Sequence, residues 1–195
     1  RFFKHGLPRD QLVFNALSSS EGVGAFVLNA LTVLNRHVNK FQAFKKHFFK
    51  WMYPSPIRHY LRTWYLSVWP YFTGFYNHHQ PQPFLKKTFI TLWEKEPEIF
   101  ENTSSSKFRN CSDISQYLFR YWQLVKGEYQ PISMKDTRYV PLTIEIIRNK
   151  EVREMITEQQ YAMLCLNDSE GICTDEEFEE AKREIQEDFS VILPK

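Results

Sequence analysis

The N-terminal part of the chain carries apolar residues at the spacing of helices. From Ala25 they recur at intervals that place them on one helical face: Val27, Leu28, Leu31, Leu34 and Val38. A second helix is predicted over Lys40–Met52. A third begins at Ser55-Pro56 and runs towards Trp69, because a hydroxyl N-cap followed by proline is typical of a helix start.

The middle of the chain combines an irregular segment with two further helices. Tyr71–Pro83 is predicted to lack regular structure, because its two closely spaced prolines interrupt any ladder of hydrogen bonds. Pro83 is expected to begin a helix whose inner stripe is Leu85, Phe89, Leu92, Trp93 and Glu96. A polar loop over Asn102–Ser112 then leads to another helix, which opens near Asp113 and ends at Gly127.

The last third of the chain alternates strand and helix patterns. Arg138–Thr143 and the apolar run Tyr161–Leu166 are predicted strands, with a helical segment over Ile144–Gln159 between them. Thr174 and Glu177 form a capping-box sequence that predicts a final helix. We therefore expect a helix-rich α/β chain, whose strand-helix-strand-helix tail adds to a Rossmann-like sheet.

These patterns divide the chain into a helical segment over residues 1–70 and a second part over residues 71–195. In the second part, residues 71–130 hold the histidine and arginine motifs described below, and residues 131–195 form the α/β tail. The chain begins Arg1-Phe2 without a methionine and reads like the middle of a longer sequence. We expect it to be a fragment of one larger domain.

Composition adds a high aromatic content and an uneven distribution of charge. Aromatic residues make up 16% of the 195 residues, and a net charge of +2 gives no indication of a general nucleic-acid binder. Residues 1–100 carry 13 Lys+Arg against 5 Asp+Glu, whereas residues 101–195 carry 12 against 18. The basic excess gathers among aromatics between Arg36 and Arg62. It fits either an ordinary solvated face or a surface for phosphates, an anionic glycan or an anionic membrane.

Cysteine usage and hydropathy indicate the compartment. Cys111, Cys165 and Cys173 are an odd set without a C-x-x-C pair, so a disulfide scaffold is not expected. No stretch reaches the ~18 apolar residues of a membrane span. We expect a cytoplasmic protein, with peripheral contact at the inner face of the plasma membrane as one use of its basic surface.

The first candidate for chemistry is His78-His79-Gln80-Pro81, within the irregular segment. Histidine titrates near neutral pH and suits proton transfer, and a segment excluded from regular structure can hold the ring towards a cleft. The alternative is a loop histidine that only hydrogen-bonds a carbonyl group.

The second candidate is Lys107-Phe108-Arg109, just ahead of a predicted helix start. Free backbone amides at a helix N-terminus attract an anion, and a guanidinium group adds a two-pronged contact to phosphate. The alternative is a surface ion pair between Arg109 and Asp113, which contributes little.

The third candidate follows the strand predicted before Asn167-Asp168. A strand that stops there places both side chains at the carboxyl end of a sheet, where open α/β folds bind ligands. Asp168 is a candidate ligand for a divalent cation, and Asn167 a candidate donor to a substrate oxygen. The alternative is an Asx turn. The acidic segment Asp168–Glu177 is not a calcium loop, because Leu166 falls where the first ligand is required.

Taken together, these motifs resemble two conserved regions of the Stealth family of sugar-1-phosphate transferases. Phe75–Gly127 resembles the third region, with its His-x-Pro, amphipathic helix, K-F-R triplet and acidic residue at the next helix start. Met163–Pro194, with MLCLNDSE followed by an acidic helix, resembles the fourth and last. The first two regions of the family would precede Arg1, so the chain resembles the C-terminal half of such an enzyme.

The resemblance implies a phosphotransferase. Members of the family move a hexose-1-phosphate or N-acetylhexosamine-1-phosphate from a nucleotide sugar to a sugar hydroxyl and form a phosphodiester. The expected partners are a nucleotide-sugar donor of the UDP-sugar type and a glycan acceptor, with no nucleic acid. We expect a bacterial enzyme of capsular or exopolysaccharide synthesis. Mg²⁺ or Mn²⁺ is the implied cofactor, with its main ligands upstream, so that this chain alone is expected to be inactive.

The resemblance also implies roles for individual residues. His79 corresponds to the family's His-x-Pro and would be the general base; its spacing to Pro81 favours it over His78. Arg109 would steady the charge on the transferred phosphoryl group. Asp113 would orient Arg109 or shape the helix start. The residues implied in substrate binding are Lys107, Asp113 and Asn167, and Asp168 is the implied metal ligand.

Two other readings of the sequence remain open. One is a glycosyltransferase, which cleaves the bond between sugar and oxygen and releases UDP, where the phosphotransferase releases UMP. The other is a noncatalytic helical module that binds anionic glycan or membrane through Arg36–Arg62. That module would keep its function without His79 or Arg109.

Overall fold

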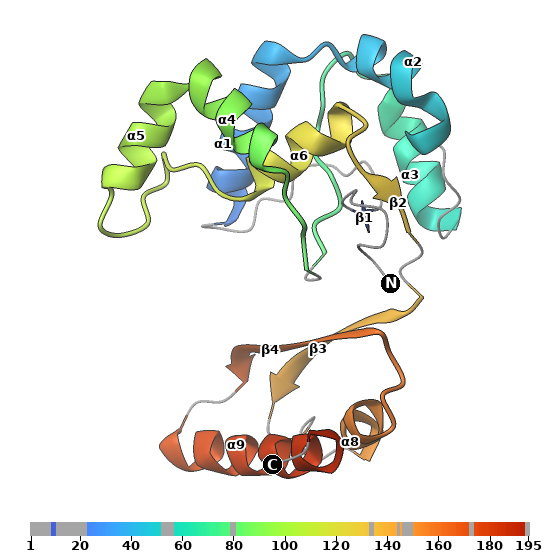
Figure 1. The fold of residues 1–195 in the computed structure, drawn as a ribbon, viewed down its shortest axis with the longest axis vertical. Coiled ribbons are helices and arrows are strands. Elements are labelled where there is room, and N and C mark those ends of the chain that lie inside the picture. Colours follow the sequence, from blue (N-terminus) through green and yellow to red (C-terminus); the bar gives the residue numbers. More distant parts are fainter. Residues whose placement is uncertain are drawn as a thin grey trace. The chain divides into compact units, whose positions relative to one another are not determined.

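The computed structural model describes residues 9–10, 23–51, 57–78, 81–132, 135–143, 145, 150–171 and 174–193 (Figure 1). The chain divides into two compact units. The first comprises Arg1–Asn77 and Gln82–Ile132, and the second comprises His78–Pro81 and Ser133–Lys195.

The first unit is helical. Its helices are α1 (Val23–His37), α2 (Lys40–Trp51), α3 (Ile57–Ser67), α4 (Lys86–Lys95), α5 (Pro97–Ser105) and α6 (Tyr117–Val125). Two short strands, β1 (Arg9–Asp10) and β2 (Gln130–Pro131), pair in parallel. The three predicted N-terminal helices are confirmed, although the predicted helix start at Ser55-Pro56 lies outside the described residues. Tyr71–Pro83 contains no helix within its described residues.

Helix α6 forms the centre of this unit. Its residues Leu118, Tyr121 and Leu124 are completely buried, and α1 contributes Ala30 and Leu34 to the same core. Figure 1 shows α1 and α6 side by side in the middle of the helical unit. Burial of apolar area contributes roughly 25 cal/mol per Å², so the contact between α1 and α6 stabilises the unit.

The predicted boundaries around α4 and α5 are corrected. The helix expected from Pro83 begins three residues later at Lys86, because Pro83 and Leu85 are held in extended form by Gln123. The Gln123 amide donates to the Pro83 carbonyl at 3.2 Å, and the Leu85 amide donates to the Gln123 side-chain oxygen at 2.8 Å. Pro97 then starts α5, which runs to Ser105, so the polar loop is shorter than Asn102–Ser112.

The junction between α4 and α5 is fixed by Glu96. This carboxylate is only 8% exposed. Arg36 Nη1 donates to both of its oxygens, at 2.8 and 2.9 Å, and His37 Nε2 lies 2.6 Å from one of them. The ion pair fastens the bend between the two helices to the end of α1.

In its described residues, the second unit pairs two parallel strands with two helices. They are β3 (Thr137–Thr143), α8 (Lys150–Thr157), β4 (Met163–Gly171) and α9 (Asp175–Ile192), in the predicted order strand, helix, strand, helix. Both helices lie on one face of the strands (Figure 1), where a small apolar core forms. Its buried members are Val140, Leu142, Val152, Met155, Ile156 and Ala181. The capping box of α9 is present, with Thr174 and Glu177 bonded reciprocally.

One predicted strand end is wrong. The strand was expected to stop at Asn167-Asp168, but β4 continues to Gly171. The pairing with β3 explains the extension, because Asn167 stands opposite Pro141 and Asp168 opposite Leu142, with an irregularity only after that pair. Asn167 therefore lies within the strand and not at its carboxyl end.

None of the helices in the described ranges combines the length and the apolar character needed to cross a bilayer.

Candidate functional site

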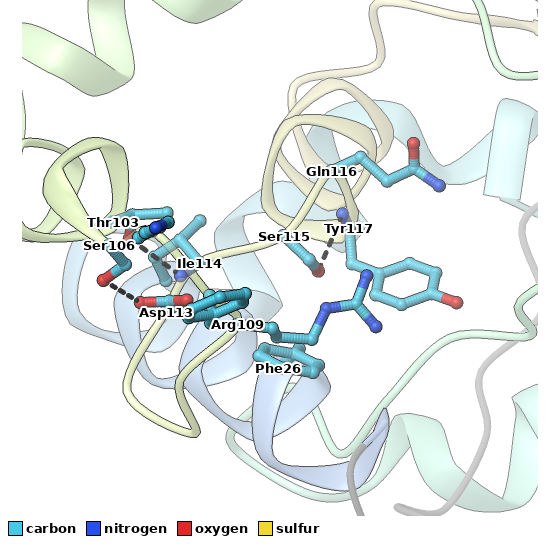
Figure 2. Close-up of a pocket in the computed structure, with 11 residues that line it drawn as sticks. Phe26, Thr103, Ser106, Arg109, Asp113, Ile114, Ser115, Gln116 and Tyr117 are labelled. Carbon is cyan, nitrogen blue, oxygen red and sulfur yellow. Dashed lines mark hydrogen bonds between the residues drawn. The ribbon is translucent and has the colours of Figure 1, made fainter.

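A pocket of about 480 Å³ lies in the first unit, beside the loop between α5 and α6. It brings together three of the six candidate residues from the sequence: Lys107, Arg109 and Asp113. The wall is completed by residues of α1, of α5 and of the start of α6 (Figure 2). The K-F-R triplet and the acidic residue that follows it therefore line the same pocket.

Arg109 extends along the aromatic ring of Phe26 from α1. The centre of its guanidinium group lies 5.0 Å from the ring centroid, a cation–π contact. Figure 2 shows the side chain passing Phe26 and pointing to the side of the pocket where Tyr117 lies. Among the described residues, Arg109 forms no ion pair with a carboxylate. Its charge is therefore held in place by a ring and not neutralised by a neighbour, which suits an anionic ligand.

Asp113 shapes the loop that carries Arg109. Its side chain is buried, at 8% exposure, and accepts the backbone amide of Asn110 at 2.7 Å and the hydroxyl of Ser106 at 3.2 Å. Both contacts close the loop on itself (Figure 2 shows the bond to Ser106). The surface ion pair between Arg109 and Asp113, the simpler interpretation of the sequence, does not occur, because the carboxylate faces the loop backbone.

The same loop is fastened to the neighbouring helices. The Asn29 side chain on α1 donates to the carbonyl oxygens of Cys111 at 2.8 Å and Asp113 at 3.0 Å. The backbone amide of Ile114 donates to the Thr103 hydroxyl on α5 at 3.0 Å. The loop is therefore tied to α1 and α5 by its own main chain, and this fixes where its side chains start.

Helix α6 begins later than predicted, at Tyr117 and not near Asp113. The intervening residues are held by side-chain and turn contacts, such as the Tyr117 amide donating to Ser115 Oγ at 3.4 Å. Ser115 and Gln116 still line the pocket, so the positive end of the α6 dipole faces the same hollow as Arg109. The dipole of α6 therefore still favours an anion in the pocket, although the helix begins later than predicted.

Lys107 adds a second cation to this pocket. Its ammonium group lies 5.5 Å from the ring of Phe108, which is 79% exposed. The pocket is thus lined by Lys107 and Arg109 and by one buried carboxylate, Asp113, that is already engaged. The balance of charge around the hollow is positive.

The histidine candidate is only partly described. His79 lies outside the described residues, and its role as the general base stays a prediction. The preceding residue in the first unit, Asn77, is held by α6. The hydroxyl of Tyr121 donates to Asn77 Oδ1 at 2.8 Å, and Arg120 Nη1 donates to the same oxygen at 3.3 Å. Burial raises the pKa of Tyr121 to about 12, so this hydroxyl keeps its proton at neutral pH.

The remaining candidates belong to the second unit. Asn167 Nδ2 donates to the Tyr139 hydroxyl at 3.1 Å, across the pair of strands. Asp168 stands in β4 opposite Leu142, and its side chain lies outside what the structure describes. In the described part of the chain, no three His, Cys, Asp or Glu side chains come together to hold a metal ion.

Several pocket residues are absent from the candidates that the sequence supplied. Phe26 lies in the predicted first helix but outside its predicted apolar stripe. Thr103 and Tyr117 lay in a predicted loop and a predicted helix face. Only the packing of α1 against α6 brings Phe26 to Arg109, and no spacing in the sequence encodes a contact over that separation.

Comparison with known proteins shows what the chain is similar to. No protein-family model matches the chain. Over most of its length the chain is similar to bacterial proteins named polysaccharide phosphotransferases, and this confirms the resemblance predicted from its motifs.

Three relatives represent that class. A capsular polysaccharide phosphotransferase WcwK of Streptococcus pneumoniae is 31% identical over 185 residues, covering 93% of this chain and 52% of the relative. The receptor polysaccharide phosphotransferase WefC of Streptococcus gordonii is 27% identical, over 90% of this chain and 52% of the relative. The exopolysaccharide phosphotransferase cps2G of Lactiplantibacillus plantarum is 28% identical, over 99% and 56%. The chain spans about half the length of these curated relatives.

Proposed function

We propose that this chain is part of a phosphotransferase that acts in capsular or exopolysaccharide synthesis. It transfers a hexose-1-phosphate or N-acetylhexosamine-1-phosphate from a nucleotide sugar to a hydroxyl group of a glycan. The observation that supports this most is the positively charged pocket around Arg109, in a chain that aligns over 93% of its length with a polysaccharide phosphotransferase.

The pocket fits a phosphoryl group by charge and by geometry. Arg109 presents a planar fork of donors that matches two phosphate oxygens, and Lys107 adds a point charge. The α6 N-terminus supplies a favourable dipole. Phosphoryl transfer depends on positioning and electrostatic stabilisation more than on covalent chemistry by the protein, and a loop tied down by Asn29 and Asp113 offers such positioning.

The proposed reaction conserves atoms and charge in one displacement. The acceptor hydroxyl oxygen attacks the β-phosphorus of the nucleotide sugar, and the bond from that phosphorus to the bridging oxygen breaks. UMP leaves with the bridging oxygen when the donor is a UDP-sugar. His79 takes the proton of the attacking hydroxyl, while Arg109 neutralises charge on the phosphoryl oxygens. Mg²⁺ or Mn²⁺, as the cofactor implied by the resemblance, would neutralise charge on the diphosphate.

The finer fold assignment is part of the same proposal. We infer that β3 and β4 belong to a larger Rossmann-like sheet in the complete protein, because a two-stranded parallel pair seldom stands alone. Asn167 lies on these strands and would bind the nucleotide sugar from there. We also infer that the enzyme is located in the cytoplasm, because the proposed donor is a nucleotide sugar.

Substitution of Arg109 in the complete enzyme tests the proposal. Arg109→Ala is expected to lower kcat/KM by roughly 10²–10³, and Arg109→Lys to restore only part of the loss, because an ammonium group cannot form the two-pronged contact. Arg183→Ala is the matched control, since Arg183 is an exposed arginine of α9, and it is expected to leave the rate unchanged. Equal rates for Arg109→Ala and the control would contradict the assigned role.

The histidine assignment has its own test. His79→Ala is expected to abolish transfer and His78→Ala to spare it. The opposite result would move the base to His78. Loss of activity in neither variant would remove the histidine from the mechanism.

Product analysis separates phosphotransfer from glycosyl transfer. Incubation of the complete enzyme with a UDP-sugar and an acceptor glycan is expected to release UMP and to leave phosphorus in the product, visible as a ³¹P phosphodiester signal. Release of UDP with a phosphorus-free glycan would identify a glycosyltransferase. A protein that binds glycan without releasing either nucleotide would be the noncatalytic module.

A further inference from the structure

Helix α3 exposes an apolar face to solvent. Six residues recur at the intervals of one helical stripe and are between 39% and 77% exposed: Ile57, Tyr60, Leu61, Trp64, Tyr65 and Val68. The helix buries a different and narrower side, through Thr63 and Leu66. An amphipathic helix of an ordinary globular protein turns its apolar side inwards, so this second apolar side needs a separate explanation.

Positive charge flanks this apolar stripe. Arg58 and Arg62 are exposed and stand one turn apart along its edge. Between Glu21 and Glu94 the sequence contains no acidic residue, whereas it contains nine lysines and arginines. The surroundings of α3 therefore attract anions and carry no carboxylate of that segment to repel them.

The local electrostatics agree with this distribution. Burial lowers the pKa of His59 on α3, and the charges of Arg58 and Arg62 lower it further. Burial likewise lowers the pKa of His47 on α2, together with neighbouring lysines. Both imidazoles thus lie in a positive potential.

We propose that the exposed face of α3 binds the surface of an anionic lipid bilayer. Helices that lie in the membrane interface typically carry tryptophan, tyrosine and leucine on one side and arginine beside them, as α3 does. Trp64 and Tyr65 enter the boundary between headgroups and acyl chains, while Arg58 and Arg62 pair with lipid phosphates. The helix lies on the bilayer, because at Ile57–Ser67 it is too short to cross it.

The shape of the unit beside α3 supports this orientation. An apolar hollow of about 500 Å³ is lined by Tyr65, Trp69 and Tyr71 and by Leu28 of α1. It extends the apolar surface beyond the end of the stripe. Lys40 fixes the last turn, with its ammonium group donating to the carbonyl oxygens of Leu66 at 2.6 Å and Trp69 at 3.0 Å. The face is therefore held by the core and does not depend on lipid to form.

Vesicle binding by the complete protein tests the inference. It is expected to co-sediment with vesicles of phosphatidylcholine and phosphatidylglycerol, and much less with phosphatidylcholine alone. The double variant Arg58→Gln/Arg62→Gln should weaken binding roughly fivefold per arginine and reduce its salt dependence. Trp64→Ser/Tyr65→Ser should weaken it roughly tenfold or more. Val191→Ser/Arg183→Gln, exposed residues of α9, serves as the matched control and should bind like the unchanged protein.

Tryptophan fluorescence locates the contact without relying on the loss of binding. Emission of the unchanged protein should shift to the blue when anionic vesicles are added. Trp64→Phe should reduce the shift strongly, whereas Trp93→Phe, which alters a half-exposed residue of α4, should keep it unchanged.

Four results would overturn the inference. The first is the absence of binding to anionic vesicles, and the second is unchanged binding in both α3 double variants. The third is that Trp64 is shielded from acrylamide before lipid is added. The fourth is that the protein is a dimer, which the α3 variants convert to monomers. Shielding would assign the face to the rest of the protein, and dissociation would assign it to a second copy of the chain.

Discussion

Lys40 provides a stability prediction with a defined sign. This lysine is 1% exposed, and its ammonium group caps the end of α3 by donating to the Leu66 and Trp69 carbonyl oxygens. Burial lowers the pKa of Lys40 from 10.5 to about 8. The folded chain therefore releases this proton at a lower pH than the unfolded chain does.

The direction follows from proton linkage. Between pH 8 and 10.5 the unfolded state binds more protons at Lys40 than the folded state, so the free energy of unfolding rises with pH in that window. From pH 7 to about 9.5 the gain attributable to Lys40 is at most about 2 kcal/mol. It is an upper value because the two carbonyl groups favour the ammonium form. Tyr121 acts in the opposite direction only above pH 10, since its folded pKa is about 12.

Denaturant titration followed by tryptophan fluorescence measures the effect at constant ionic strength. The unchanged chain and Lys45→Met, which alters an exposed lysine of α2, should both gain stability between pH 7 and 9.5. Lys40→Met should lack that part of the gain. The same pH dependence in Lys40→Met as in Lys45→Met would refute the assignment of the proton to Lys40.

Three further substitutions test contacts described above. Glu96→Gln removes the carboxylate that joins Arg36 and His37, and should lower the free energy of unfolding by about 2 kcal/mol in denaturant titration, whereas exposed Glu98→Gln should change it little. Asn29→Ala should cost about 1–2 kcal/mol and speed amide hydrogen exchange in the loop before α6; unchanged exchange there would contradict the clamp. Thr174→Ala should cost about 1 kcal/mol and shorten α9 in circular dichroism, and Thr174→Ser should restore most of it.

The sequence predicted the elements whose signals are local. Helices α1 to α3, the capped start of α9 and the strand-helix-strand-helix order all follow from periodicity, caps and prolines within a few residues of each element. The similarity to polysaccharide phosphotransferases was likewise predicted from short motifs in a fixed order. Such signals do not depend on how distant parts of the chain meet.

The predictions that were wrong concern boundaries and contacts that depend on residues distant in the sequence. The start of α4 is displaced because Gln123 holds Pro83 and Leu85 extended. Strand β4 continues past Asn167 because β3 offers it further backbone partners. Asp113 accepts a hydrogen bond from the backbone of its own loop, and this contact depends on where the loop turns. The sequence shows only that Arg109 and Asp113 lie four residues apart, which suggested an ion pair between them.

The hydrogen-bonded brace around the loop has a consequence for substitutions at the tip of the loop. The path of the loop is set by Asn29, Thr103 and Asp113 through its main chain, and none of these bonds involves the side chain of Lys107 or Arg109. The two cations can thus be exchanged without rebuilding their support. Single substitutions at Lys107 or Arg109 can therefore change which ligand the pocket prefers, while Asn29, Thr103 and Asp113 keep the path of the loop unchanged.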